Sequence, residues 1–267
     1  MINRQVHVFE NGIQVFDDHL VPEQRKRYAI RNVHEIEEEE IFVKLIRSMP
    51  TDGCFVNIGA AIGYYPLLAK KHSPQLTIHA IEPLEIHRTF FCENIGLNGL
   101  RLSDFIHHPF GVSDSDGEAM LIEDRFMTSI QGGQASDAQG GLYHQIKSIM
   151  KSMVVDTGLR QPKKTISITT HSLNTIMAMI GRPVDLCQMD IQGIEFEALK
   201  GASKTLADRT IQTFLIGTHG KKLHQNCAAL LREQGYLIEV DEPTPKDQPD
   251  GILVARLKEV SFTRSFM

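Results

Sequence analysis

The sequence contains little cysteine, and none of it is spaced to bind zinc. Three of the four cysteines fall in or beside apolar runs, as buried free thiols do. No two of them form a CxxC pair; they are Cys54, Cys92, Cys187 and Cys227. This pattern indicates a reducing compartment and no structural zinc.

Excess positive charge and long apolar segments are also missing. The chain has 28 Lys and Arg against 33 Asp and Glu, a net charge of -5. Nucleic acids and anionic membranes are bound mainly through Lys and Arg, so we expect neither as a partner and favour a small acceptor molecule. No apolar stretch approaches the roughly 20 residues that span a bilayer, and the first residues do not resemble a signal peptide. We therefore expect a cytoplasmic location.

Residues 1–50 predict an extension ahead of the main domain. Val6–Glu10 and Ile13–Asp17 alternate polar and apolar residues around Asn11-Gly12, a dipeptide typical of a type I′ hairpin turn. From Glu35 to Met49 the apolar residues share one helical face. The glutamates Glu37–Glu40 on the opposite side predict a solvated helix face.

From about Asp52 to Leu257 the pattern alternates between strand and helix, which is the signature of a parallel sheet. The expected strands are Cys54–Ile58, Thr77–Ile81, Asp104–Val112, Val184–Asp190, Gln212–Gly217, Tyr236–Val240 and Ile252–Leu257. The expected helices are Tyr64–Lys71, Glu85–Leu97, Leu173–Ile180, Ile194–Leu206 and Leu223–Gln234. Residues 51–267 are thus predicted to form a doubly wound, Rossmann-like α/β domain around a seven-stranded, mostly parallel sheet.

Between Arg125 and Thr165 this rhythm is lost. The segment is rich in glycine and serine and carries one amphipathic piece, Tyr143–Met153. A long irregular insertion in a compact domain is usually a functional lid or a disordered segment. We expect 125–165 to act as a lid over the acceptor site.

A glycine turn carries the prediction of a ligand. The apolar strand Cys54–Ile58 leads into Gly59 and Gly63, after which a helix begins at Tyr64. Glycines let the backbone pass close to a ligand, and a helix start offers N–H groups to a carboxylate or a phosphate. The second strand ends in Glu82-Pro83, where a carboxylate can accept hydrogen bonds from both hydroxyls of a ribose. A nucleoside ligand is indicated, with a turn whose glycines serve packing alone as the alternative.

The glycine that NAD-binding turns use for close approach to the pyrophosphate is absent. In the pattern GxGxxG it would stand two residues before Gly59, where this chain has Asn57. A nucleoside joined to an amino acid, S-adenosylmethionine, suits this turn better, although an NAD-dependent oxidoreductase stays open as a minor alternative. Tyr64 can equally be a core residue. The expected cofactor-binding residues are Asn57, Gly59, Gly63, Tyr64, Glu82, Pro83 and Asp190.

Several segments together resemble the FkbM-type family of class I S-adenosylmethionine-dependent methyltransferases, from about Glu35 onward and apart from the insertion. The resemblance implies the Rossmann-like fold of that class and O-methylation of a hydroxyl on a small molecule, such as a sugar or polyketide-type metabolite. It leaves the acceptor open. The segments are Asn57–Tyr65, Ile81–Pro83, Asn94–Asn98, Gly111–Gly117, Met189–Glu195 and Leu199–Ala202.

The chain departs from the family at three charged positions. Members often have Lys and Glu where this chain has Gln188 and Gln192, and Glu where it has Gly217. Loss of a positive and a negative charge together suggests that an amide pair replaces an ion pair. These losses keep open a second reading, a catalytically silent module that binds the cofactor.

Methyl transfer to an alcohol requires a base that removes the hydroxyl proton during attack. The carboxyl ends of the strands line the ligand crevice in doubly wound sheets, which places Asp190 and His219 there. With an ordinary pKa near 6.5, His219 is predicted to act as a neutral base, with Asp190 as the alternative. Glu195 follows as a carboxylate favoured by a helix N-terminus. Only Asp190, Glu195 and His219 are plausible neighbours, so no metal site is predicted.

Overall fold

A seven-stranded sheet forms the centre of the molecule. The computed structural model describes residues 4–123, 130–131 and 164–258. The strand order is β12-β13-β11-β10-β3-β4-β5, and all neighbours are parallel except β13, which is antiparallel to β11 and β12. The strands are β3 (Cys54–Ile58), β4 (Thr77–Ile81), β5 (Ile106–His108), β10 (Val184–Met189), β11 (Ile211–Thr218), β12 (Tyr236–Glu242) and β13 (Gly251–Leu257). The predicted doubly wound fold is confirmed.

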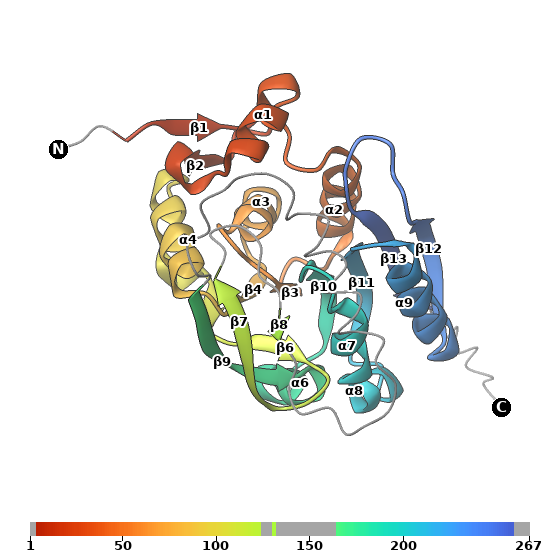
Figure 1. Ribbon diagram of the computed structural model, residues 1–267. Helices are drawn as coiled ribbons and strands as arrows, with labels where there is room; N and C mark the ends of the chain where they lie inside the picture. Colours follow the sequence, from red (N-terminus) through yellow and green to blue (C-terminus); the bar gives the residue numbers. More distant parts are fainter. Residues whose placement is uncertain (1–3, 124–129, 132–163, 259–267) are drawn as a thin grey trace.

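Helices cover both faces of this sheet (Figure 1), and each face has its own hydrophobic core. Successive residues of β3 point to opposite faces, so Phe55 enters one core while Cys54 and Val56 enter the other. Burial on both sides explains why the central strand β3 is almost entirely apolar. One core takes residues from α2 (Ile36–Ser48), α3 (Tyr64–His72) and α4 (Glu85–Leu97); the other takes them from α6 (Leu173–Ile180), α7 (Glu195–Lys200), α8 (Ser203–Ala207) and α9 (Lys221–Glu233).

The helix predicted over Ile194–Leu206 is two helices, α7 and α8, joined at Gly201 and Ala202. A side chain at Gly201 would place its Cβ 2.5 Å from the carbonyl oxygen of Ser113. The chain therefore needs glycine here to pass another backbone segment closely, and the helix is interrupted at that contact.

The N-terminal hairpin is confirmed, but its turn is not of the expected type. The strands β1 (Val6–Val8) and β2 (Gln14–Phe16) are antiparallel. A type I′ turn needs positive φ at both central residues, whereas Gly12 has φ 78° and Asn11 is not among the residues with positive φ. The N–H of Gly12 instead donates to the carbonyl of Phe9 at 2.8 Å, so the turn begins at Phe9. The N–H of Phe9 donates to the carbonyl of Ile13 at 2.9 Å and closes the hairpin loop. Between hairpin and α2 lies a helix that was not predicted, α1 (Pro22–Ile30).

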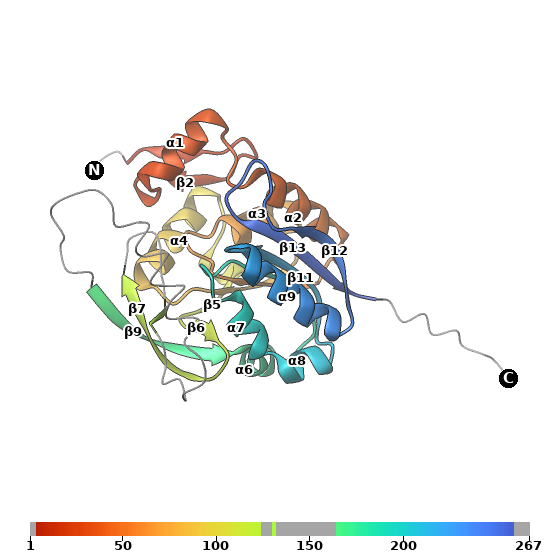
Figure 2. The same ribbon diagram turned by 45° about the vertical axis from the view of Figure 1, so that its right-hand side comes forward.

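A second, four-stranded sheet lies beside the first, next to α6 (Figures 1 and 2). The single strand predicted over Asp104–Val112 is wrong, because β5 ends at His108. The next residue, Pro109, has no N–H to donate and separates β5 from the second sheet. Apart from 130, 131, 164 and 165, the expected lid 125–165 lies outside the described residues, as does all of Tyr143–Met153. The strands, in the order β6-β9-β7-β8, are β6 (Gly111–Ser113), β9 (Lys164–Ser172), β7 (Gly117–Glu123) and β8 (Ile130–Gln131).

Of the helices in the described part of the chain, none is both long and apolar enough to cross a membrane. The four cysteines are free thiols, and Cys92 alone among them is exposed.

Candidate functional site

The glycine turn after β3 packs directly against the end of β10. Gly59 has φ 86°, and a Cβ there would lie 2.1 Å from the carbonyl oxygen of Asp190. Gly63, with φ 87°, precedes α3, and a Cβ there would lie 2.0 Å from the ring of Phe91. At both positions glycine is therefore required by the positive φ and by the lack of space for a side chain. The contact of Gly59 with Asp190 joins the turn to the crevice at the carboxyl ends of the strands.

We expect Gly59→Ala to destabilise the protein by about 2–5 kcal/mol, the sum of a left-handed backbone cost of about 1–2 kcal/mol and an overpacking cost of about 1–3 kcal/mol. Gly99→Ala is the matched control, because Gly99 has φ 68° but nothing within 4 Å of an added Cβ. It should lose only the backbone part, about 1–2 kcal/mol. Urea unfolding measures both; equal losses would show that the contact with Asp190 is unimportant.

Glu82 stands beside the turn with its carboxylate held by backbone donors. Its Oε2 accepts from the N–H of Ala61 and its Oε1 from the N–H of Leu84, both at 2.9 Å. The side chain is buried, and Pro83 follows it at the end of β4. Because a carboxylate offers about four acceptor positions, positions remain for a ribose hydroxyl.

Asn57 and Tyr64 point to protein partners. The buried amide of Asn57 donates to the side chain of Gln188 on the neighbouring strand. The hydroxyl of Tyr64 contacts the carboxylate of Glu39 and accepts from Asn11 Nδ2 at 2.7 Å, which turns the ring toward α2 and the hairpin. Tyr64 thus lies in the core, the alternative raised from the sequence.

The side chains of Gln188 and Gln192 do not contact each other, so the interpretation that an amide pair replaces an ion pair is wrong. Gln188 is buried, accepts from Asn57 and donates to Glu38 Oε1 at 3.1 Å. Gln192 is exposed, has φ 58° and lies 3.3 Å from Asp190 Oδ1. The residues flank Asp190 on a strand and a turn, which send their side chains in different directions.

The structure brings Asp190, Glu195 and His219 together. His219 follows β11, its Nδ1 lies 3.0 Å from Glu195 Oε1, and its Nε2 lies 3.6 Å from Asp190 Oδ1. Glu195 is fully buried at the start of α7 and also accepts from the N–H groups of Ile191 and Gly193. The buried carboxylate fixes the imidazole so that Nε2 faces Asp190.

A further carboxylate reaches the same histidine. Asp250, in the loop before β13, places its Oδ1 3.3 Å from His219 Nε2. Burial disfavours the charged imidazole, but the hydrogen bond to Glu195 and the charges of Asp190, Glu195 and Asp250 outweigh it and raise the pKa of His219 to about 10. The surrounding carboxylates thus favour the protonated imidazole over the neutral form expected from the sequence. Burial raises the pKa of Asp190.

One of the four glutamates expected on a solvated face of α2, Glu38, instead points inward, whereas Glu40 is exposed. Glu38 is fully buried, and its N–H donates to Gln248 Oε1 at 3.0 Å. It shares a helical face with the buried residues Phe42, Leu45 and Ile46, at spacings of four, seven and eight residues. This spacing was the signal that could have revealed an acid on the inner side of the helix.

Among the described residues, two groups of side chains could hold a metal ion. Within each group, one ligand atom per residue lies within 4.8 Å of the others. The first group, Asp190, Glu195 and His219, was considered from the sequence. The second, Glu35, Asp190 and Asp250, was missed, because Glu35 and Asp250 come from elements outside the strand–helix motifs.

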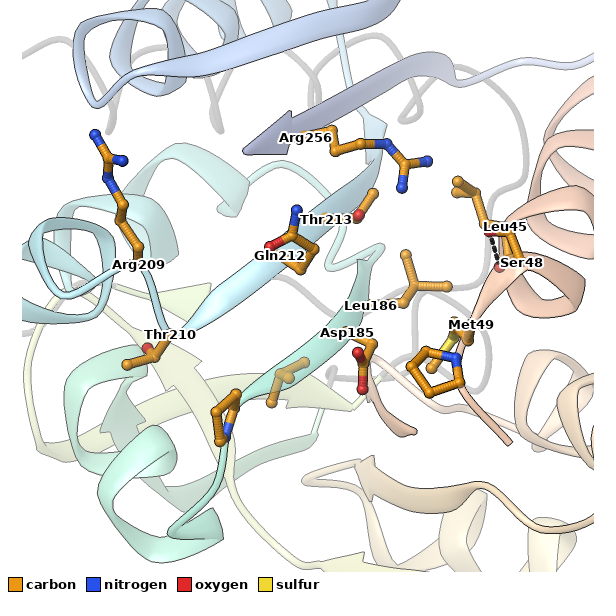
Figure 3. Close-up of a pocket in the computed structure, with 13 residues that line it drawn as sticks. Leu45, Ser48, Met49, Asp185, Leu186, Arg209, Thr210, Gln212, Thr213 and Arg256 are labelled. Carbon is orange, nitrogen blue, oxygen red and sulfur yellow. Dashed lines mark hydrogen bonds between the residues drawn. The ribbon is translucent and has the colours of Figure 1, made fainter. Parts of the chain in front are cut away.

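A cavity of about 430 Å³ lies at the amino ends of the strands, opposite the glycine turn. Figure 3 shows Asp185, Thr210 and Gln212 along it, at or near the amino ends of β10 and β11. Asp185 Oδ2 accepts from the N–H of Cys54 at 2.8 Å. Ligands of doubly wound sheets bind at the carboxyl ends of the strands, so the candidate site is the cluster around Asp190 and not this cavity.

Comparison with known proteins matches residues 57–238 to the methyltransferase FkbM domain. Methyltransferase 1 of Beauveria bassiana is 24% identical over 252 residues, which cover 91% of this chain and 97% of that protein. A putative methyltransferase of Jannaschia is 33% identical over 84 residues, 28% of this chain and 30% of that protein. A solved structure of a methyltransferase FkbM from Methylobacillus flagellatus is 16% identical, with a TM-score of 0.47, and covers 77% of this chain and 44% of that one.

Proposed function

Because the chain belongs to the FkbM methyltransferase family and is a methyltransferase, we propose that it transfers the methyl group of S-adenosylmethionine to a hydroxyl oxygen of a small molecule. The observation that carries the proposal is the contact between Gly59 and Asp190. It sets the glycine turn beside an acidic cluster in which both ring nitrogens of His219 face carboxylates. Cofactor loop and proton-handling groups thus meet at one edge of the sheet.

The residues around the turn fit S-adenosylmethionine. Gly59 and Gly63 keep the backbone free of side chains, and Glu82 offers acceptor positions for ribose hydroxyls. Asn57, in place of the pyrophosphate-contacting glycine, favours a ligand without a diphosphate over NAD. When bound, the cofactor supplies an electrophilic methyl carbon on a sulfonium.

The chain's own contribution is to hold the acceptor oxygen and to remove its proton. We assign this to Asp190 and His219 acting as a pair, because the buried Glu195 holds Nδ1 and leaves Nε2 facing Asp190. Protons on such closely interacting groups belong to the pair and not to either residue. The imidazolium also compensates the carboxylates that surround it.

The charges at the crevice support a small acceptor over a nucleic acid. Asp190 and Asp250 are each about one-fifth exposed there, with side-chain values of 21% and 18%. Carboxylates at the mouth of a site repel a phosphate backbone, as does the net charge of -5. The free thiols support a cytoplasmic location.

Glu82→Ala should weaken binding of S-adenosylmethionine by about 1.5–3 kcal/mol, roughly 10- to 150-fold, because hydrogen bonds to a charged group are lost. Glu85→Ala is the control, since Glu85 is exposed in the first turn of α4. Titration calorimetry with both variants measures the effect. An unchanged affinity in Glu82→Ala would contradict the ribose role.

The reaction itself is tested by following S-adenosylhomocysteine formation with a panel of hydroxylated sugars and polyketide-type metabolites. Turnover with a hydroxyl acceptor, together with loss of turnover when that hydroxyl is blocked, is the expected result. Binding of the cofactor without turnover on any acceptor would favour the silent module, and tight binding of NAD would favour an oxidoreductase.

A further inference from the structure

Three carboxylates from separate parts of the fold, Asp190 among them, converge at the carboxyl end of β10. Glu35 lies at the start of α2, and Asp250 precedes β13. One carboxylate oxygen from each of Glu35, Asp190 and Asp250 lies within 4.8 Å of the others. Glu35 is 5% exposed, whereas Asp190 and Asp250 reach solvent, so the cluster is largely buried but open on one side.

Positive charge near this cluster is limited. His219 contacts Asp190 and Asp250 through Nε2, and the charge of Arg27 acts on Glu35 and Asp250. Burial, followed by the charges of the neighbouring acids, raises the pKa of Glu35 well above its usual range. Taking several carboxylates out of water is costly unless a cation or protons neutralise them.

A fourth carboxylate points at the same place with one oxygen unused. Glu38 is fully buried; its Oε1 accepts from Gln188 at 3.1 Å, but its Oε2 has no hydrogen-bond partner among the described residues. That oxygen lies 3.5 Å from where a Cβ on Gly217 would stand, and the same position is 3.4 Å from Asp190 Cγ. Oε2 therefore faces Asp190 across the space that Gly217 leaves. A buried acceptor without a donor is rare and costly, and a cation would supply its missing partner.

We propose that Glu35, Asp190 and Asp250 form a binding site for a hard divalent cation of the magnesium or manganese type, with Glu38 beside it. Carboxylate oxygens suit such cations. The elements are already tied together, because Glu38 N–H donates to Gln248 Oε1 at 3.0 Å and Gln248 Nε2 donates to the carbonyl of Asp250 at 3.1 Å. A cation here would polarise an acceptor hydroxyl that reaches it. That role rests on the proposed function, whereas the binding does not.

The test is a calorimetric titration of Mn²⁺ into the full chain after removal of metals with a chelator, without cofactor or acceptor. The wild type should show saturable binding. Glu35→Gln and Asp250→Asn should each weaken it by at least the roughly tenfold seen on losing even an outer partner of a metal ligand. Glu40→Gln and Asp247→Asn are matched controls, exposed on the same helix and the same loop, and should bind as the wild type does.

Two results would overturn the site: no binding of Mn²⁺ or Mg²⁺ up to about 1 mM, the weak end of protein sites for hard cations, or wild-type affinity in both variants. Circular dichroism checks folding, and because the variants lie in different elements, one that unfolds leaves the other to decide. Mn²⁺ should also raise the melting temperature of the wild type and not of a folded variant. Failure of the proposed function is separate, since it would show as absent methyl transfer while Mn²⁺ still binds.

Discussion

His219→Ala is expected to lower turnover by roughly a hundred- to ten-thousandfold, the range typical for loss of a group that handles the proton. The substitution removes the partner of Asp190 and leaves Glu195 buried without its imidazole. The affinity for S-adenosylmethionine should change little, because the proposed cofactor residues lie on β3, in the turn between β3 and α3, and directly after β4. Folded fraction, cofactor affinity and single-turnover rate are measured on the same sample.

His224→Ala is the matched control for this experiment. His224 is also buried, but its ring contacts Thr218 Oγ1 at 2.8 Å and Asp241 Oδ1 at 2.9 Å instead of the cluster. It should lose stability while keeping turnover per folded molecule. If His219→Ala behaves in the same way, His219 is only a structural histidine, and the proton-handling role passes to Asp190 alone.

Asp190→Asn should reduce turnover by a similar factor, roughly a hundred- to ten-thousandfold. Asparagine keeps the shape of the side chain but can neither take a proton nor compensate the imidazolium of His219. Asp185→Asn is the control, since Asp185 lies near the start of β10, at the opposite end from Asp190, and accepts a hydrogen bond from the N–H of Cys54. Rapid-quench measurement of methyl transfer at saturating cofactor compares them. Normal rates in Asp190→Asn would remove Asp190 from the reaction.

The sequence was sufficient wherever the local pattern and the tertiary environment agree. The strands Cys54–Ile58 and Thr77–Ile81 and the helices Glu85–Leu97 and Leu173–Ile180 have the predicted bounds. The strands are buried on both faces and are therefore mostly apolar. A capping serine, Ser172, precedes the helix Leu173–Ile180. Asp190 and His219 were located by the rule that strand ends line the crevice, which needs only the order of the elements.

What the sequence could not provide were contacts between distant segments. Glu38 bonds Gln248, 210 residues further along the chain, and no local pattern encodes that meeting. The run of glutamates looks like a solvated face because charge usually faces water, yet Glu38 occupies an inward position of the helix. The approach of Asp250 to His219 was missed for the same reason, since the two residues meet only in the folded chain.

The reversed direction of β13 decides which residues can join the site. In a wholly parallel sheet, the residues that flank the strands at the end where β11 stops would all follow their strands. β13 is antiparallel to β11, and its first residue, Gly251, pairs with the last residue of β11, Thr218. The residue before β13 therefore lies at the carboxyl end of β11. Asp250, directly before β13, thus contacts His219, directly after β11. The antiparallel direction of β13 therefore places the carboxylate of Asp250 in the crevice that also contains the glycine turn after β3.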